Sequence, residues 1–120
     1  MPLIRLSVSK ELTEESRQQL VDGLGEAMRK IPGKGPEMLM VDLEEGKTMY
    51  IAGVTQENTV FADIQYFSNF KHSHKQEFTA AAFEAVNKAI GTAKDKMFLT
   101  ITERNTWGAF GDFRDEFYSE

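Results

Sequence analysis

The sequence predicts an α+β fold in which a β-α-β unit occurs twice, with two helices on one face of a four-stranded mixed sheet. The hydrophobic pattern switches along the chain between a period of two residues and a period near 3.6, as expected when strands alternate with helices. Apolar positions also recur 59 residues apart, so that Leu24 corresponds to Phe83 and Ile31 to Ile90. Two repeated β-α-β units with right-handed crossovers satisfy both observations.

The first repeat spans about residues 2–45. Alternating apolar residues predict a strand at Pro2–Val8, and Met38–Leu43 reads as a second strand. Between them, Thr13 is a suitable N-cap for a helix that Pro32-Gly33 ends. One helical stripe carries its apolar side chains: Leu20, Leu24, Ala27, Met28 and Ile31. Gly23 and Gly25 lie inside this helix, and we expect them to allow a close approach to the sheet.

The second repeat spans about residues 59–104 and follows a weaker short strand at Thr48–Ala52. Thr59–Phe67 alternates and predicts a strand, and Met97–Glu103 predicts the last long strand. Ser73 begins a capping-box pattern for the intervening helix, and Gly91 ends that helix. The helix has its own apolar stripe: Phe78, Ala82, Phe83, Val86, Ala89 and Ile90.

Residues 105–120 form a C-terminal tail, which opens with a Gly- and aromatic-rich turn, so residues 1–120 are predicted to be a single domain. The sheet face opposite the helices is predicted to be too apolar to remain in water. We expect another subunit to cover that face, and a closed ring is the usual arrangement. The residues assigned to it are Leu39, Val41, Leu43, Phe61, Phe67 and Phe98.

Composition restricts the classes of partner. The chain has 14 Lys and Arg against 19 Asp and Glu, which gives a net charge of −5. An acidic surface argues against binding to nucleic acids or anionic membranes, because these need clustered basic residues. A β-α-β-β-α-β RNA-binding domain is disfavoured for the same reason. No apolar run is long enough for a membrane span and no signal peptide is recognised, so we expect a soluble cytoplasmic protein.

Familiar catalytic motifs are absent from the sequence, including the nucleophile elbow, the P-loop and the zinc-protease helix motif. The chain has no cysteine, which excludes disulfides, thiol catalysis and cysteine metal sites. His72 and His74 lie two residues apart without an acidic cluster, and a solvated helix start is the better interpretation of this pair. We therefore predict no metal and no cofactor.

Pro2 is the best catalytic candidate. If the initiator Met1 is removed, Pro2 carries a free secondary amine, which can act as a general base. An ordinary α-amino group titrates near pH ~8, and an apolar environment lowers its pKa further by penalising the charged form. A proline at position 2 is by itself weak evidence, since it is common at an extended chain start.

Other segments of the sequence support a catalytic role for Pro2. The strand beginning Met1-Pro2-Leu3-Ile4, the helix end at Gly33-Lys34-Gly35-Pro36 and the turn at Asn105–Gly111 together resemble the tautomerase superfamily. The resemblance covers residues 2 to about 111 and is closest to the branch of macrophage migration inhibitory factor and phenylpyruvate tautomerase. It implies a β-α-β repeat assembled as a homotrimer, with active sites at the subunit boundaries.

The resemblance also implies roles for individual residues. Pro2 would be the catalytic base of a cofactor-free keto–enol tautomerase, and Lys34 would bind the carboxylate of a 2-oxo acid substrate. A solvated cation near the helix C-terminus is an equally good interpretation of Lys34. Phe67 falls where the family uses a backbone amide near the substrate. Trp107 and Phe110, together with Phe113, would supply apolar walls that keep the amine neutral, although aromatic packing at a subunit seam explains them as well.

Several positions depart from the family pattern. Phe98 stands where the family has an active-site tyrosine, and Thr100 stands where it has an asparagine. The cysteine pair of some relatives is absent, which excludes thiol redox activity. Arg5 and Arg104 are candidates for binding a second carboxylate, but we interpret them as surface cations.

The predicted function is tautomerisation of phenylpyruvate-type 2-oxo acids, with Phe98, Thr100, Trp107 and Phe110 around the substrate. The missing tyrosine leaves two alternatives open. One is a non-catalytic trimeric module for binding or signalling. The other is a related Pro2-dependent hydratase or decarboxylase that acts on a short acid. A small-molecule substrate and two further copies of the chain are the expected partners, without nucleic acid or membrane.

Overall fold

Residues 2–118 are described by a computed structural model. The two helices are α1 (Glu14–Met28) and α2 (His72–Ile90). The long strands are β1 (Pro2–Val8), β2 (Met40–Glu44), β5 (Val60–Phe67) and β6 (Met97–Arg104). Four short strands form hairpins: β3 (Tyr50–Ile51), β4 (Val54–Thr55), β7 (Thr106–Ala109) and β8 (Asp112–Asp115). Short 3₁₀ helices span Pro36–Met38 and Lys94–Lys96.

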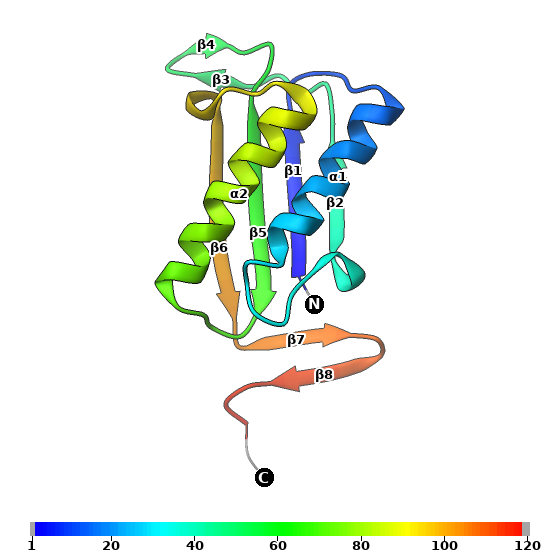
Figure 1. Ribbon diagram of the computed structural model, residues 1–120, viewed down its shortest axis with the longest axis vertical. Helices are drawn as coiled ribbons and strands as arrows, with labels where there is room; N and C mark the ends of the chain where they lie inside the picture. The colour runs from blue at the N-terminus through cyan, green and yellow to red at the C-terminus, as the bar shows by residue number, and fades with distance from the viewer. Residues whose placement is uncertain (1, 119–120) are drawn as a thin grey trace.

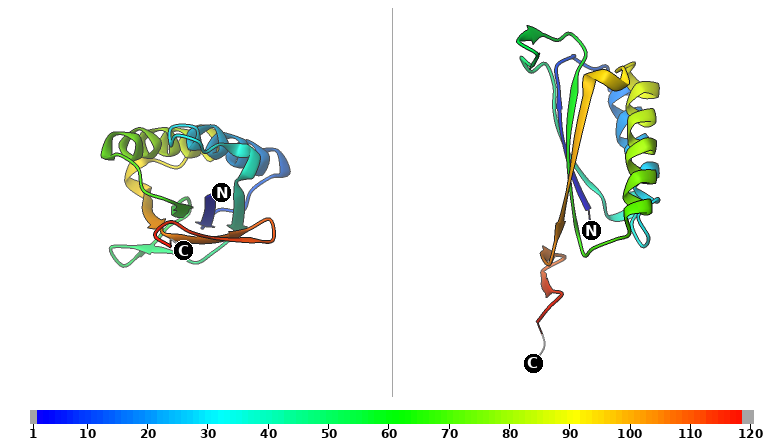
Figure 2. Two further views of the ribbon diagram at one scale, coloured as in Figure 1. Left: turned by 90° about the horizontal axis from the view of Figure 1, so that it is seen from below. Right: turned by 90° about the vertical axis from the view of Figure 1, so that its left-hand side faces the viewer.

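The long strands form one sheet in the order β2-β1-β5-β6. Within each β-α-β unit the two strands are parallel, and the units join through the antiparallel pair β1–β5. Both helices lie on one face of this sheet, and the β7–β8 hairpin extends beyond the end at which β1 begins (Figures 1 and 2). The predicted α+β architecture, with two helices on one face of a four-stranded mixed sheet, is therefore confirmed.

The core fills the space between the helices and the sheet. Alternate residues of β1 and β5 meet the apolar stripes of α1 and α2, as the two periodicities require. Its largest fully buried side chains are Tyr66, Phe78, Ile4, Leu6, Leu20, Leu24, Met28, Ile31 and Ile64. The same packing aligns the start of β1 with the end of β5, since Pro2 pairs with Tyr66.

The helix ends follow local hydrogen bonding. Thr13 caps α1 as predicted, and Ser16 completes a reciprocal capping box with it. The regular part of α1 ends at Met28, before the predicted stop at Pro32, because the next amides bond three residues back; Ile31 N donates to Met28 O at 3.0 Å. The predicted cap at Ser73 is wrong. The carbonyl of Lys71 already accepts bonds from the first turn of α2, which places Ser73 inside the helix.

The glycines of α1 face other elements than predicted. A Cβ added to Gly23 would lie 3.1 Å from Ala85 Cβ of α2, and one added to Gly25 would lie 2.7 Å from Pro36 Cβ. The close approach that Gly23 permits is therefore between the two helices, not between a helix and the sheet. The physical reason is that the stripe of Leu20 and Leu24 already occupies the sheet-facing side of α1.

The sheet face opposite the helices is more polar than predicted. Leu39, Val41 and Leu43 pack against the core instead, because β2 pairs with β1 so that Val41 lies beside Ile4 and Leu43 beside Leu6. The strand itself begins at Met40, not at Met38. Side chains alternate along the strand, so Met40 and Asp42 lie on the face away from the helices.

The open face, defined as the sheet face away from the helices, consequently has a charged centre. Arg5 lies 3.7 Å from Asp42, and Asp63 pairs in register with Arg5. These residues line a shallow cavity of about 300 Å³. The exposed Met40 and Phe98 lie toward opposite ends of this face. A partner subunit on the open face would therefore meet charged groups as well as apolar ones.

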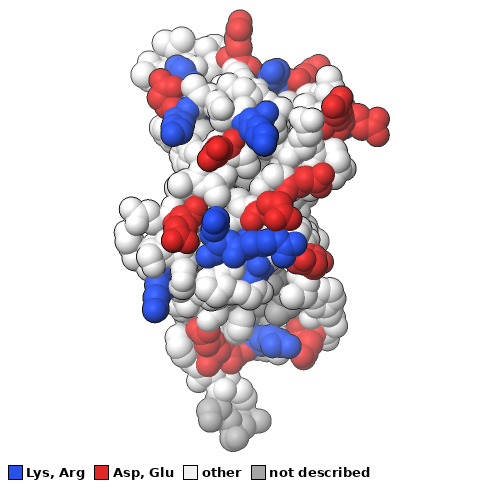
Figure 3. Space-filling view, viewed as in Figure 1, with Lys and Arg blue, Asp and Glu red and all other residues white. Residues whose placement is uncertain are grey.

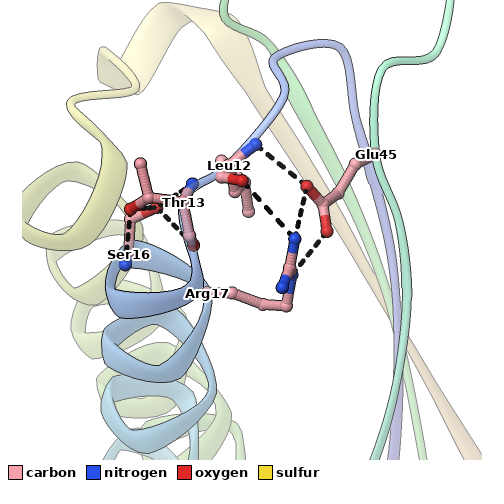
Figure 4. A network of polar contacts seen from close by, with 5 residues as sticks. All are labelled: Leu12, Thr13, Ser16, Arg17 and Glu45. Carbon is pink, nitrogen blue, oxygen red and sulfur yellow. Dashed lines mark hydrogen bonds and ion pairs between the residues drawn. The ribbon is translucent and has the colours of Figure 1, made fainter.

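At the β2 end of the first repeat, Glu45 joins the sheet to the start of α1 (Figure 4). It accepts a hydrogen bond from Leu12 N at 2.9 Å and lies 2.6 Å from Arg17 Nε. The hydrogen bonds from Arg17 and Leu12 hold the pKa of Glu45 below its usual value. This cluster fixes the entry of the chain into α1.

The surface over the helices carries both signs of charge, interspersed along α1 and α2 (Figure 3). Such mixing differs from the single basic stripe that phosphate backbones require. Within residues 2–118, no helix has the length and hydrophobicity that crossing a membrane would take.

Candidate functional site

The candidate site lies at the end of the sheet where β1 begins. Pro2 is buried there, on the helix side of the sheet, and pairs with Tyr66 near the end of β5. The catalytic interpretation of Pro2 requires removal of Met1, which lies outside the described residues. A free amine at this position would adjoin the apolar core, and burial disfavours the charged form of an amine.

Tyr66 is the side chain beside Pro2 that the sequence interpretation missed. It is fully buried, and its hydroxyl donates to Glu103 Oε2 at 3.0 Å. Burial and the neighbouring carboxylate both raise the pKa of the Tyr66 hydroxyl, so Tyr66 remains protonated and neutral at physiological pH. Antiparallel pairing of β1 with β5 brings the end of β5 to the start of β1. An expected pairing of these two strands would therefore have identified Tyr66 as the neighbour of Pro2.

Glu103 is the second missed residue and collects three hydrogen bonds. Besides Tyr66, it accepts from Phe70 N at 2.8 Å and pairs with Lys75 Nζ at 3.0 Å. Burial acts to raise the pKa of Glu103, but the hydrogen bonds from Lys75, Phe70 and Tyr66 outweigh it and lower this pKa. The sequence held a signal for Glu103: it continues the core-facing alternation of Met97, Leu99 and Ile101. A carboxylate at such a position needs partners.

Lys34 lies in the turn after α1 at the same end of the molecule. Its backbone amide donates to Ile31 O at 3.0 Å, and its Nζ lies 5.8 Å from the centroid of the Phe70 ring. Phe70 in turn contacts Tyr66 edge-on, with ring centroids 5.5 Å apart. Burial lowers the pKa of the Lys34 ammonium. None of the ion pairs among residues 2–118 includes Lys34.

Phe67 lies at the same sheet end but points to the open face. The β1–β5 ladder ends at the pair Pro2–Tyr66, so Phe67 extends one residue beyond this ladder. Its backbone therefore lies next to the Pro2 end, where the resemblance places an amide that contacts substrate.

Phe98 and Thr100 lie on the open face, away from Pro2 of the same protomer. Phe98 is level with Ser7 of β1, five residues from Pro2, which corresponds to about 17 Å along the strand. Thr100 is level with Arg5, about 10 Å along the strand from Pro2. One protomer therefore does not bring these two side chains to its own Pro2.

Trp107 and Phe110 belong to the β7–β8 hairpin. Phe110 and Gly111 form its two-residue turn, both with positive φ (53° and 77°), which matches a type I′ hairpin. Trp107 is half-buried, whereas Phe110 is 81% exposed and Phe113 is also exposed. The turn was predicted from its glycines and aromatic residues, but the paired strands on either side of it were not.

The hairpin connects to the same loop that carries Phe70. Ser68 and Asn69 both bond the carboxylate of Glu116, and Glu116 N donates to Asn105 O at 2.8 Å. The loop between β5 and α2 thus contacts the hairpin through Glu116 and the site through Phe70. Among residues 2–118, no cluster of three or more His, Cys, Asp or Glu has the geometry to hold a metal ion.

Comparison with models of protein families and with curated protein sequences finds no match. Solved structures do match. MIF2 of Leishmania major superposes with a TM-score of 0.85 at 18% identity, covering 94% of this chain and 97% of that one. A fused 4-OT, described as a wild-type symmetric trimer, superposes with a TM-score of 0.75 at 15% identity and 85% coverage of both chains.

A third match is malonate semialdehyde decarboxylase, with a TM-score of 0.74 at 14% identity, covering 92% of this chain and 91% of that one. At such low identity the likeness to these three structures concerns the fold alone. The chain has the fold of the tautomerase superfamily, to which all three structures belong.

Proposed function

We propose that the protein is a cofactor-free keto–enol tautomerase of phenylpyruvate-type 2-oxo acids, with the Pro2 amine as general base. The observation that carries this proposal is the convergence of Pro2 and Lys34 on the Tyr66–Phe70 pair. A buried secondary amine and a cation that forms no ion pair within residues 2–118 are the two groups that the reaction needs.

In the proposed reaction, the neutral Pro2 nitrogen removes a proton from C3 of the keto acid. The C–H electron pair forms the C2–C3 double bond, and the carbonyl electrons move to the C2 oxygen. This oxygen then takes the proton back from the prolinium, which yields the enol and regenerates the base. A base is most effective when its pKa lies near the operating pH, and burial moves an α-amine in that direction.

Lys34 would bind the substrate carboxylate. Its ammonium contacts the Phe70 ring, and none of the described ion pairs occupies it, so its charge remains available to an anion. A cation–carboxylate hydrogen bond is stronger than a neutral one and also fixes the direction of the substrate. The carbonyl group of a 2-oxo acid would then point along a defined line toward Pro2.

We propose further that the working unit is a homotrimer. The fused 4-OT structure is a trimer, which supports this by similarity of fold. Phe98 and Thr100 of one protomer lie about 17 Å and 10 Å along the strands from its own Pro2, so they would reach a Pro2 site only across a subunit boundary. Trp107 and Phe110 of the hairpin would form apolar walls of the pocket.

The test compares two forms of the protein. Mass spectrometry first establishes whether Met1 is removed, and the loss or gain of enol absorbance of phenylpyruvate is then followed. A matched form that retains Met1 carries an amide nitrogen at Pro2, which has no basic lone pair. We expect its kcat to fall by at least about 100-fold, the range in which a lost general base acts. Full activity with Met1 retained would refute the proposal.

Two alternatives have observations in their favour. Phe98 has no hydroxyl to donate to a developing enolate, which favours a non-catalytic trimeric module for binding or signalling. The similarity to malonate semialdehyde decarboxylase, whose structure report names decarboxylase and hydratase activities, favours a Pro2-dependent reaction on a short acid. Product identification separates these cases, because only decarboxylation releases CO₂ and only hydration adds the mass of water.

A further inference from the structure

We propose that Glu103 is a positioning residue that holds Phe70 beneath Lys34 and thereby sets the place of the Lys34 ammonium. The inference rests on the proposed function in its kinetic part, because Lys34 is taken to bind the substrate carboxylate. Its structural part concerns only the contacts among Glu103, Phe70 and Lys34.

Glu103 joins three segments that are distant in sequence. Its carboxylate accepts hydrogen bonds from Tyr66 OH at the end of β5, from Phe70 N in the following loop, and from Lys75 Nζ in the first turns of α2. The Glu103 side chain is only 16% exposed. Each partner would lose an acceptor if the carboxylate were removed, and Phe70 N has no other hydrogen bond among those described.

Phe70 transmits this restraint to Lys34. Its backbone is held by Glu103, and its ring packs edge-on against Tyr66 at an interplanar angle of 73°. Tyr66 is itself fixed by Glu103 through its hydroxyl. The ring therefore has two restraints with a common origin, besides its packing against the edge of the core, and it lies 5.8 Å from the Lys34 ammonium. Loss of Glu103 would release both restraints together.

The charges of the cluster support a positioning role over a direct one. Glu103 pairs with Lys75, so its negative charge is balanced within the cluster. Glu103 does not contact Lys34 directly; it acts on Lys34 through the Phe70 ring. The π-face of that ring attracts the ammonium without neutralising its charge. Lys34 is thus placed while its charge stays available for a substrate carboxylate.

The molecule contains a matched control. Glu45 also accepts a backbone N–H, from Leu12, and pairs with a cation, Arg17, and its side chain is 23% exposed. It lies after β2, near the pair Ser7–Glu44, at the end of the sheet away from Pro2. Glu45→Gln therefore removes a similar carboxylate without touching the Phe70–Lys34 contact.

The experiment uses the full chain labelled with ¹³C at lysine Cε, with the Lys34 signal assigned through Lys34→Arg and its ring-current shift measured against Phe70→Leu. For Glu103→Ala we expect the Lys34 signal to lose at least about half of that shift. KM for phenylpyruvate is expected to rise about tenfold with kcat within about twofold, the pattern of lost substrate binding. Glu103→Gln keeps an acceptor for Phe70 N but loses the charge that pairs with Lys75, so it should change both readouts measurably, by less than Glu103→Ala does.

The position of the Lys34 signal in each variant decides whether Glu103 positions Lys34. If the Lys34 signal stays at the wild-type position in folded Glu103→Ala, the positioning role is wrong; if that variant does not fold, Glu103→Gln must show a partial shift of the signal or the proposal fails. A shift of equal size in Glu45→Gln would also overturn it, because the effect would then be general loosening. If wild type turns over no enol while the Lys34 signal moves as expected, the tautomerase proposal fails and the positioning role stands.

Discussion

The two ends of the sheet use the same chemistry to different effect. At one end Glu45 binds Leu12 N and Arg17, and at the other Glu103 binds Phe70 N and Lys75. Both carboxylates thus tie a loop amide and a basic side chain to the end of a strand. The two ends differ in the groups that adjoin each carboxylate and its partners.

Beyond Glu45 lies the exposed capping box of Thr13 and Ser16, which serves only to begin α1 (Figure 4). Beyond Glu103 lie a buried tyrosine, an aromatic ring and a half-buried lysine, next to the chain start. We call each of these arrangements, in which Glu45 or Glu103 binds a loop amide and a basic side chain, a carboxylate clamp. Such a clamp alone says nothing about function. The clamp gains a functional meaning when the group it fixes is reactive or charged and lies beside a candidate base.

The largest expected difference between the two ends concerns substrate binding. Lys34→Ala should raise KM for phenylpyruvate about 30- to 150-fold, since a lost charge-assisted hydrogen bond is worth about 2–3 kcal/mol. Lys10→Ala, at the Glu45 end, should leave KM unchanged, because the Lys10 ammonium donates to the carbonyl of Ile90 at 3.5 Å, far from Pro2. Steady-state kinetics of both variants provide the measurement. If Lys34→Ala and Lys10→Ala had equal KM values, the substrate-binding site could not be assigned to the Pro2 end of the sheet.

The next effect concerns stability. Glu103→Ala leaves Phe70 N and Tyr66 OH without their acceptor in a buried environment, so we expect a loss of about 2–3 kcal/mol in the free energy of unfolding. Glu45→Ala should cost less, because water can reach Leu12 N and Arg17 more readily. Urea unfolding of the two variants against wild type measures the difference. A larger loss for Glu45→Ala would reverse the ranking of the two clamps.

The smallest effect is the dependence of stability on pH. The pKa values of Glu103 and Glu45 are both lowered from their ordinary value of 4.5 by their hydrogen bonds. A carboxylate with a lowered folded-state pKa contributes stability above its unfolded pKa and loses that contribution as the pH falls through the folded value. We expect wild type to lose stability below about pH 4.5. Thermal melts at several pH values should show a flatter profile for Glu103→Gln combined with Glu45→Gln, and an unchanged profile would contradict the assigned linkage.

Much of the fold was predictable because local pattern and local chemistry coincide. The alternation at Pro2–Val8 matches β1, Thr13 caps α1, and Gly91 ends α2 in the left-handed conformation with φ 75°. The cap of α2 was not predictable from Ser73. A capping-box sequence states only that a cap can form, and here the backbone turn begins earlier at Lys71.

Two features could be assigned only with the strand pairing known: which face of β2 meets the helices, and which residues contact Glu103. The apolar run Met38–Leu43 indicates a strand but does not say which of its two faces meets the helices, and the pairing of Leu3 with Met40 decides it. Glu103 was recognisable only as an acidic residue in an apolar alternation. Its partners come from residues 66, 70 and 75, and no local pattern connects these to position 103.

The order of residues along the chain is enough to predict the two β-α-β units, the absence of cysteine chemistry and Pro2 as a candidate base, whereas the role of Lys34 is what the tautomerase resemblance implies. The predictions made from the residues alone use periodicity and residue type, which are local properties of the chain. The side chains that surround Pro2 and Lys34, and the distance of Phe98 and Thr100 along the sheet from Pro2 of their own protomer, follow from the folded arrangement. Strand register and loop packing join residues distant in sequence, and their free energies come from contacts that exist only in the folded chain.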